Sequence, residues 1–174
     1  MPPDPSICAM TPEIRPLVMR ANRLLGASLV EHNLVKIEHL EQANERLLEI
    51  LNSDDLSQAT VLGVLAYELK AVKEDDVLAH LVDSEGIGLV DLRCYDVSDE
   101  IRKNLDLQAC WATWSVPFDR EEDFIFIATA YYLSPAVRNY WEKLLKAPII
   151  WYGTTLENIS TLLERVESER GTVA

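Results

Sequence analysis

Three histidines are the residues with the most direct potential for metal chemistry, because neutral imidazole is a common ligand of transition metals. They are His32, His39 and His80. The spacing of His32 and His39 would place both on one face of a continuous helix, but Asn33 is expected to end a helix between them. No third ligand has a spacing that joins them, so the sequence predicts no metal site and leaves the histidines on solvent-facing helical surfaces.

The three cysteines, Cys8, Cys94 and Cys110, offer the next possible chemistry. An odd number of widely spaced cysteines is not a disulfide framework, and no pair has the spacing of a zinc knuckle. Free thiols that are buried or partly buried are therefore expected in a reducing compartment.

Runs of carboxylates occur at 54–55, 74–76 and 121–123. Each run lies at an expected turn or helix start, where capping and the helix dipole explain acidic residues. A hydrolase with paired carboxylates would need apolar surroundings that raise the pKa of one partner. The chain also contains no Walker P-loop, no GxGxxG and no GxSxG motif. We therefore predict no catalytic residues and a protein that is not an enzyme.

Charge and hydropathy narrow the possible partners. The 174 residues carry a formal net charge of −13, which disfavours nucleic acid and anionic membrane surfaces. No apolar run approaches the roughly 20 residues that span a bilayer, and the proline-rich start lacks a signal-peptide pattern. These features predict a cytoplasmic protein whose partner is another protein, without nucleic acid and without membrane insertion.

Apolar periodicity divides the chain into two parts. Prolines mark residues 1–12 as a flexible leader. Residues 13–83 read as a helical subdomain, with Gly26 interrupting its first helix. The expected helices of this part cover 13–25, 27–33, 36–51, 57–69 and 75–83.

Residues 84–166 read as a small α/β sandwich-like subdomain, followed by a flexible tail at 167–174. The expected order is β-α-β-β-α-β-α, which makes the whole chain an α+β protein. The strands are expected at 89–92, 111–118, 124–130 and 148–152. The helices are expected at 99–105, 135–145 and 155–166, with a further short helical step at 107–110.

The C-terminal part resembles the N-terminal domain of the type II secretion and type IV pilus assembly ATPases of bacteria. The resemblance rests on the segments Gly-Ile-Gly-Leu-Val-Asp-Leu (86–92), Trp-Ser-Val-Pro-Phe (114–118), Phe-Ile-Phe-Ile-Ala-Thr-Ala (124–130) and Ile-Ile-Trp-Tyr (149–152). Gly88 stands where that family often has Pro, and Ser134 where it often has Asp. The ATPase domain is absent, so the resemblance implies a free-standing regulatory domain or a fragment.

The helical part resembles, in degenerate form, the motif with which some members of that family bind cyclic di-GMP. The family motif begins Arg-Leu-Gly, continues with an aliphatic pair, an inner Gly and a second aliphatic pair, and usually occurs twice. The first copy here is Leu24-Leu25-Gly26, Leu29-Val30 and Asn33-Leu34-Val35, and a weaker second copy is Val61-Leu62-Gly63 followed by Ala71-Val72. The resemblance implies a nucleotide site formed by Leu25, Gly26, Leu29, Val30, Leu34 and Val35.

The copies depart from the family motif at its polar and glycine positions. The Arg aligns with Leu24 and Val61, the inner Gly with Asn33 and Lys70, and the terminal Gln with Leu47 and Ser84. The resemblance therefore implies first a non-catalytic interaction or regulatory module without a cofactor, whose partner is a secretion or pilus assembly component or a motor ATPase. The alternative is a cyclic di-GMP sensor with a divergent motif. Tyr131 and Tyr132 are the expected surface aromatics of a protein interface.

Overall fold

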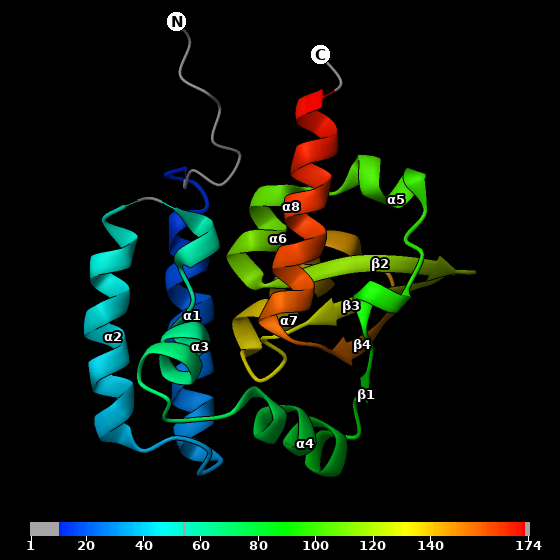
Figure 1. Cartoon of the computed structure of the whole chain (residues 1–174). Helices are drawn as coiled ribbons and strands as arrows, with labels where there is room; N and C mark the ends of the chain where they lie inside the picture. The colour runs from blue at the N-terminus through cyan, green and yellow to red at the C-terminus, as the bar shows by residue number, and fades with distance from the viewer. Residues whose placement is uncertain (1–10, 54, 173–174) are drawn as a thin grey trace, which may run out of the picture.

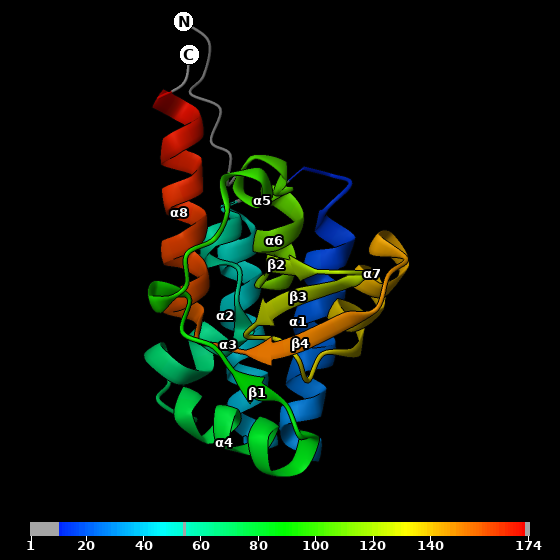
Figure 2. The ribbon, with the colours of Figure 1, turned by 90° about the vertical axis from the view of Figure 1, so that its right-hand side faces the viewer.

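The computed structural model describes residues 11–53 and 55–172, so most of the predicted leader and the last two residues of the predicted tail lie outside it. The described chain is 61% helical with a four-stranded mixed sheet, which confirms the predicted α+β class. The helices of the first half of the chain lie beside and below the sheet, and those of the second half surround it (Figures 1 and 2). Among the described residues, no helix is long and apolar enough to cross a membrane.

The helical side is built from the first half of the chain (Figure 1). Its elements are α1 (Arg15–Glu31), α2 (Ile37–Leu51), the 3₁₀ turn η1 (Leu56–Gln58), α3 (Val61–Gly63), the π-helical η2 (Val64–Glu68) and α4 (Glu74–Glu85). Each longer helix buries its apolar stripe in the core and leaves charged residues in solvent, as amphipathic helices do.

The expected break at Gly26 is wrong, because α1 continues through this residue. A glycine inside a helix costs only about 1 kcal/mol. A Cβ at Gly26 would lie 2.6 Å from Leu40 Cδ1, so the glycine lets α2 approach α1 closely. The glycine thus serves packing between two helices.

The single helix expected at 57–69 is also wrong. The backbone is extended at Thr60, whose side chain caps α3 by accepting from the Gly63 N–H at 3.1 Å. The helix then widens, and the Leu69 N–H donates to the Val64 carbonyl at 2.9 Å. Threonine favours such caps over helix interiors, because its hydroxyl competes for backbone groups.

The second half of the chain forms the sheet and the helices around it. Its elements are β1 (Gly88–Leu89), η3 (Leu92–Cys94), α5 (Asp99–Asn104), α6 (Leu107–Thr113), β2 (Ser115–Glu121), β3 (Phe124–Thr129), α7 (Pro135–Leu145), β4 (Ile149–Gly153) and α8 (Leu156–Thr172). The strand order is β1-β4-β3-β2. The β2–β3 pair is antiparallel, whereas β4 is parallel to both β1 and β3.

The start of the second strand differs from the prediction. Residues 111–113 belong to α6, and β2 begins at Ser115. Trp114 takes a left-handed conformation with φ 48° at the junction. Trp111 and Trp114 are both buried, with ring centroids 5.3 Å apart. An alternation of tryptophan with small residues is typical of a strand. Here residues 111–113 are helical instead, and this places both tryptophan rings in the core.

The last helix continues to Thr172, beyond the end expected near Val166. Arg170 in the added turn donates to the carbonyls of Arg102 at 2.9 Å and Leu105 at 2.7 Å. These carbonyls lie where α5 ends and lack helical partners. The guanidinium therefore joins the end of α8 to the end of α5.

One hydrophobic core runs through both halves of the chain. Helix α1 packs against α6 and α7 of the second half, and α6 packs in turn against α8. The helical part and the sheet part are consequently in direct contact.

Candidate functional site

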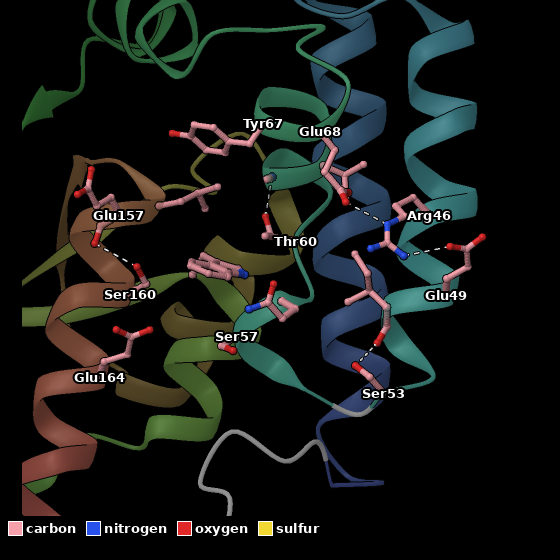
Figure 3. Close-up of a pocket in the computed structure, with 16 residues that line it drawn as sticks. Arg46, Glu49, Ser53, Ser57, Thr60, Tyr67, Glu68, Glu157, Ser160 and Glu164 are labelled. Carbon is pink, nitrogen blue, oxygen red and sulfur yellow. Dashed lines mark hydrogen bonds and ion pairs between the residues drawn. The ribbon is translucent and has the colours of Figure 1, made fainter.

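A groove with a volume of about 740 Å³ separates the helical side from α8 (Figure 3). Its residues come from α2, Ser53, the segment 57–68 and α8, together with Trp114. A groove of this origin exists only when both halves of the chain are packed together.

Acidic side chains form both walls of the groove. Figure 3 shows Glu157 and Glu164 on α8, on one side of the groove, and Glu49 and Glu68 beside Arg46 on the other side. One arginine, Arg46, lines the groove against these four glutamates. The groove therefore attracts cations and basic side chains and repels anions.

Arg46 is already engaged by two of the glutamates. Its Nε donates to Glu68 at 3.1 Å and its Nη1 to Glu49 at 3.0 Å. The hydrogen bond to Glu68, and then that to Glu49, raises the pKa of Arg46. No ion pair is found for Glu157 or Glu164 among the described residues, so these two carboxylates remain available to a partner.

Apolar side chains give the acidic groove a surface for packing. Ile50, Val64, Trp114 and Leu156 line it, and Tyr67 at its edge is 62% exposed. Acidic walls around an apolar floor fit an amphipathic partner whose basic residues flank an apolar stripe.

A buried hydrogen-bond network fixes the helical wall to the sheet part. The Tyr131 hydroxyl donates to Asn22 Oδ1 at 2.6 Å and lies 2.6 Å from Thr60 Oγ1. Asn22 Oδ1 also accepts from the Val61 N–H at 2.8 Å, and its Nδ2 donates to the Val18 carbonyl at 2.8 Å. Burial raises the pKa of Tyr131, so its hydroxyl keeps its proton.

A second link crosses the groove edge through Glu74, at the start of α4. One carboxylate oxygen accepts from the Leu156 N–H at 2.8 Å, at the start of α8. The other accepts from the Tyr67 hydroxyl. This hydrogen bond, with desolvation adding to it, raises the pKa of Tyr67 to about 12. The first turn of α8 is thereby tied to α4.

The six residues predicted from the degenerate motif lie together where α1 turns into α2. Those with buried side chains pack between the helices, and Gly26 is the close approach to Leu40. The buried members are Leu25, Gly26, Leu29 and Val35, and the half-buried ones are Val30 and Leu34. A shallow hollow of about 420 Å³ is lined by Val30, Leu34 and Val35 together with Lys36.

The two motif copies share a left-handed turn. Asn33 and Lys70, the residues aligned with the family's inner glycine, have φ of 60° and 51°. Asn33 ends α1 in a Schellman arrangement, in which the Leu34 N–H donates to the Leu29 carbonyl at 2.9 Å. Both positions thus keep the backbone conformation that glycine adopts most easily.

Two further predictions on functional residues can be compared with the structure. Tyr131 is wrong as a surface aromatic, because it is fully buried in the polar network. Tyr132 is half-buried, with the Arg138 guanidinium 4.9 Å from its ring centroid. Cys110 is buried, which raises the pKa of its thiol, whereas Cys94 is exposed. Cys8 lies outside the described residues.

Sequence reasoning missed the groove because the segments that form its walls are far apart in the sequence. Glu157, Ser160 and Glu164 have the spacing of one helical face, but polar residues on one face are the rule for surface helices. Only the packing of α8 beside the helical part gives this face a partner wall.

Comparisons with known proteins identify the fold. No protein-family profile matches the sequence, and no curated protein matches it. Among solved structures, one of MshE with cdg superposes with a TM-score of 0.52 at 18% identity, over 82% of this chain and 97% of that chain. The N-terminal domain of XpsE superposes with a TM-score of 0.55 at 19% identity, over 83% of this chain and 94% of that chain. A second crystal form of that domain superposes with a TM-score of 0.51 at 18% identity, over 82% of this chain and 93% of that chain.

MshE and XpsE are secretion and pilus ATPases, and the matched regions are their N-terminal domains. The structural similarity covers both halves of the chain and confirms the predicted resemblance at the level of the fold. Identities below 20% make this a statement about architecture, and function has to be argued from the site.

Proposed function

We propose that this chain is a non-catalytic protein-interaction module, of the kind represented by the N-terminal domains of secretion and pilus assembly ATPases, and that it binds a basic segment of its partner in the acidic groove. The observation that carries the proposal is the groove itself, which four glutamates and several apolar side chains line together; the glutamates are Glu49, Glu68, Glu157 and Glu164. The partner class is a secretion or pilus assembly component or a motor ATPase, as the shared fold suggests.

The chemistry of the groove supports binding over catalysis. No histidine is among its described lining residues. The Ser57 hydroxyl donates to Asp55 at 2.6 Å, and the Ser160 hydroxyl donates to the Glu157 carbonyl at 3.1 Å. These two serine hydroxyls are thus used in local turns, and neither belongs to a serine–histidine pair of the kind that activates a nucleophile.

Charge placement gives a direct test of the groove. A fluorescent amphipathic peptide of Lys and Leu at helical spacing is titrated with the protein and followed by anisotropy. Neutralising the available carboxylates with Glu157→Gln and Glu164→Gln should weaken binding about 3- to 30-fold, from roughly 0.3–1 kcal/mol for each of the two exposed charges. Added salt should weaken binding by the wild-type protein through screening.

The matched control changes the same amount of charge elsewhere. Glu38→Gln and Glu41→Gln lie on the exposed face of α2 and should leave the affinity within about twofold. A peptide with Glu in place of Lys should not bind. Equal losses from both variant pairs would mean that only net charge matters, and the groove would be rejected as the docking site.

The alternative, a cyclic di-GMP sensor, is favoured by the left-handed turns at Asn33 and Lys70 and by the solved structure of MshE with cdg, which we read as cyclic di-GMP. Lys36, beside the hollow at the end of α1, could meet a phosphate. Calorimetric titration with cyclic di-GMP, with GTP and cyclic di-AMP as controls, tests this function. Selective, saturable binding that Lys36→Gln weakens would support it, and no heat at micromolar ligand would exclude it.

A further inference from the structure

Two histidines and a glutamate that are distant in the sequence converge at the lower edge of the helical side. His32 caps the end of α1, and His80 and Glu85 lie in the second half of α4. The ring centroids of His32 and His80 are 4.6 Å apart. One nitrogen from each ring and one Glu85 oxygen all lie within 4.8 Å of one another.

His80 has an unused ligand atom in this cluster. Its Nε2 is buried and has no hydrogen-bond partner among the described residues. The nearest carboxylate oxygen is Glu85 Oε1, at 3.8 Å. A buried polar atom without a hydrogen-bond partner costs free energy and is uncommon in folded proteins. A bound ligand would satisfy this nitrogen. His32 is exposed, which leaves an entry route from solvent.

The electrostatic setting favours a cation. The C-terminal ends of α1 and α4 meet at the cluster, and each carries the negative end of a helix dipole. Both helices lie wholly within the described residues, and neither has a lysine or arginine in its last turn. The Glu85 carboxylate adds a full negative charge to these partial ones.

We propose that His32, His80 and Glu85 bind one zinc ion or a similar divalent transition metal. Two imidazole nitrogens and a carboxylate oxygen are a common set of protein ligands for zinc, and three such ligands leave a fourth position for water. Tetrahedral zinc holds its ligands about 3.3–3.5 Å apart, so the present spacing closes by small side-chain rotations. The ion links the end of α1 to α4 and stabilises the turn at Asn33.

The test is calorimetric titration of Zn²⁺ into untagged, metal-free protein, with a thermal melt at each end point. The wild type should bind one equivalent and melt at a higher temperature with zinc. His32→Ala and His80→Ala should each weaken affinity at least about 10-fold and abolish the thermal shift. His39 is a half-buried histidine outside the cluster, so His39→Ala should bind zinc with the affinity of the wild type.

Glu85→Gln provides a second variant at a solvent-accessible helix end, in case a histidine variant fails to fold. It should keep the melting temperature of the metal-free protein and weaken zinc binding. Co²⁺ spectra identify the ligands, because thiolate coordination gives strong charge-transfer bands. Thiolate bands, unchanged affinity in His32→Ala, or no saturation at about 100 μM Zn²⁺ would overturn the proposal.

Discussion

Removing the hydroxyl of Tyr131 should loosen the attachment of the helical side to the sheet. Tyr131→Phe deletes two buried hydrogen bonds, each 2.6 Å long, to Asn22 and Thr60. Because the Tyr131 proton goes to Asn22 Oδ1, the Thr60 hydroxyl must donate to Tyr131. The substitution therefore leaves the Thr60 proton without its acceptor, whereas Asn22 Oδ1 still accepts from the Val61 N–H.

These contacts set the size of the effect. Each of the two hydrogen bonds makes a net contribution of about 1 kcal/mol to stability, and an unsatisfied buried hydroxyl costs about 1–3 kcal/mol. These terms overlap, so we expect a loss of about 2–3 kcal/mol in the free energy of unfolding. For a domain of this size that corresponds to a fall of about 5–10 °C in Tm.

Urea denaturation followed by tryptophan fluorescence measures this loss. Thr60→Val and the double variant complete a mutant cycle, in which a coupling energy of about 1 kcal/mol is expected. Tyr132→Phe is the matched control, because its ring contacts with Trp151 and Arg138 survive. The control should lose less than about 0.5 kcal/mol in the free energy of unfolding. An equally small loss in Tyr131→Phe would show that the network does not hold the two parts together.

Two further predictions concern the turn and the groove edge. Asn33→Ala should lower the free energy of unfolding, measured in urea, by about 1 kcal/mol, because alanine is strained at φ 60°. Asn33→Gly should stay within about 0.5 kcal/mol of the wild type. Equal stability of the two variants would show that the turn relaxes. The raised pKa of Tyr67 favours the protonated phenol in the folded state, so its stabilising contribution is complete below pH 10 and is lost as pH rises through about 12. The difference in unfolding free energy between wild type and Tyr67→Phe should shrink over that interval, and a constant difference would contradict the hydrogen bond to Glu74.

Local patterns predicted the elements that have one clear apolar face. Helix α2 was expected at 36–51 and runs from Ile37 to Leu51, and α7 begins after Ser134 as its Ser-Pro start indicated. The hairpin was expected because β-branched and aromatic residues dominate 124–130, although β2 itself starts later than predicted. In these cases the local preference and the buried face agree.

Tertiary contacts decided the elements that were missed. Gly26 breaks a helix by propensity alone, yet here it makes room for Leu40. Residues 167–172 look like a polar tail, but Arg170 finds the carbonyls at the end of α5. Neither partner is visible within a short sequence window.

The candidate sites show the same limit. The turn at Asn33 was predicted from the tendency of asparagine to end a helix in the left-handed conformation, which is a local preference. The acidic groove and the His32–His80–Glu85 cluster combine residues from distant helices, so spacing along the chain could not reveal them. Spacing in the sequence offered only His32 and His39 as a pair, which was rejected because Asn33 separates them, whereas the structure brings His32 next to His80.

The central claim, that the groove binds a basic segment of a secretion or pilus component or a motor ATPase, is tested most directly by site-specific photo-crosslinking in living cells of the source organism. Benzoylphenylalanine replaces Tyr67, which is 62% exposed at the groove, or Phe124, which is 42% exposed at the hairpin. We predict that the probe at Tyr67 crosslinks to a basic segment of such a protein. Glu157→Gln with Glu164→Gln should reduce the amount of this product severalfold, and the probe at Phe124 should not form it. No product at Tyr67, or the same products from both positions, would contradict the claim.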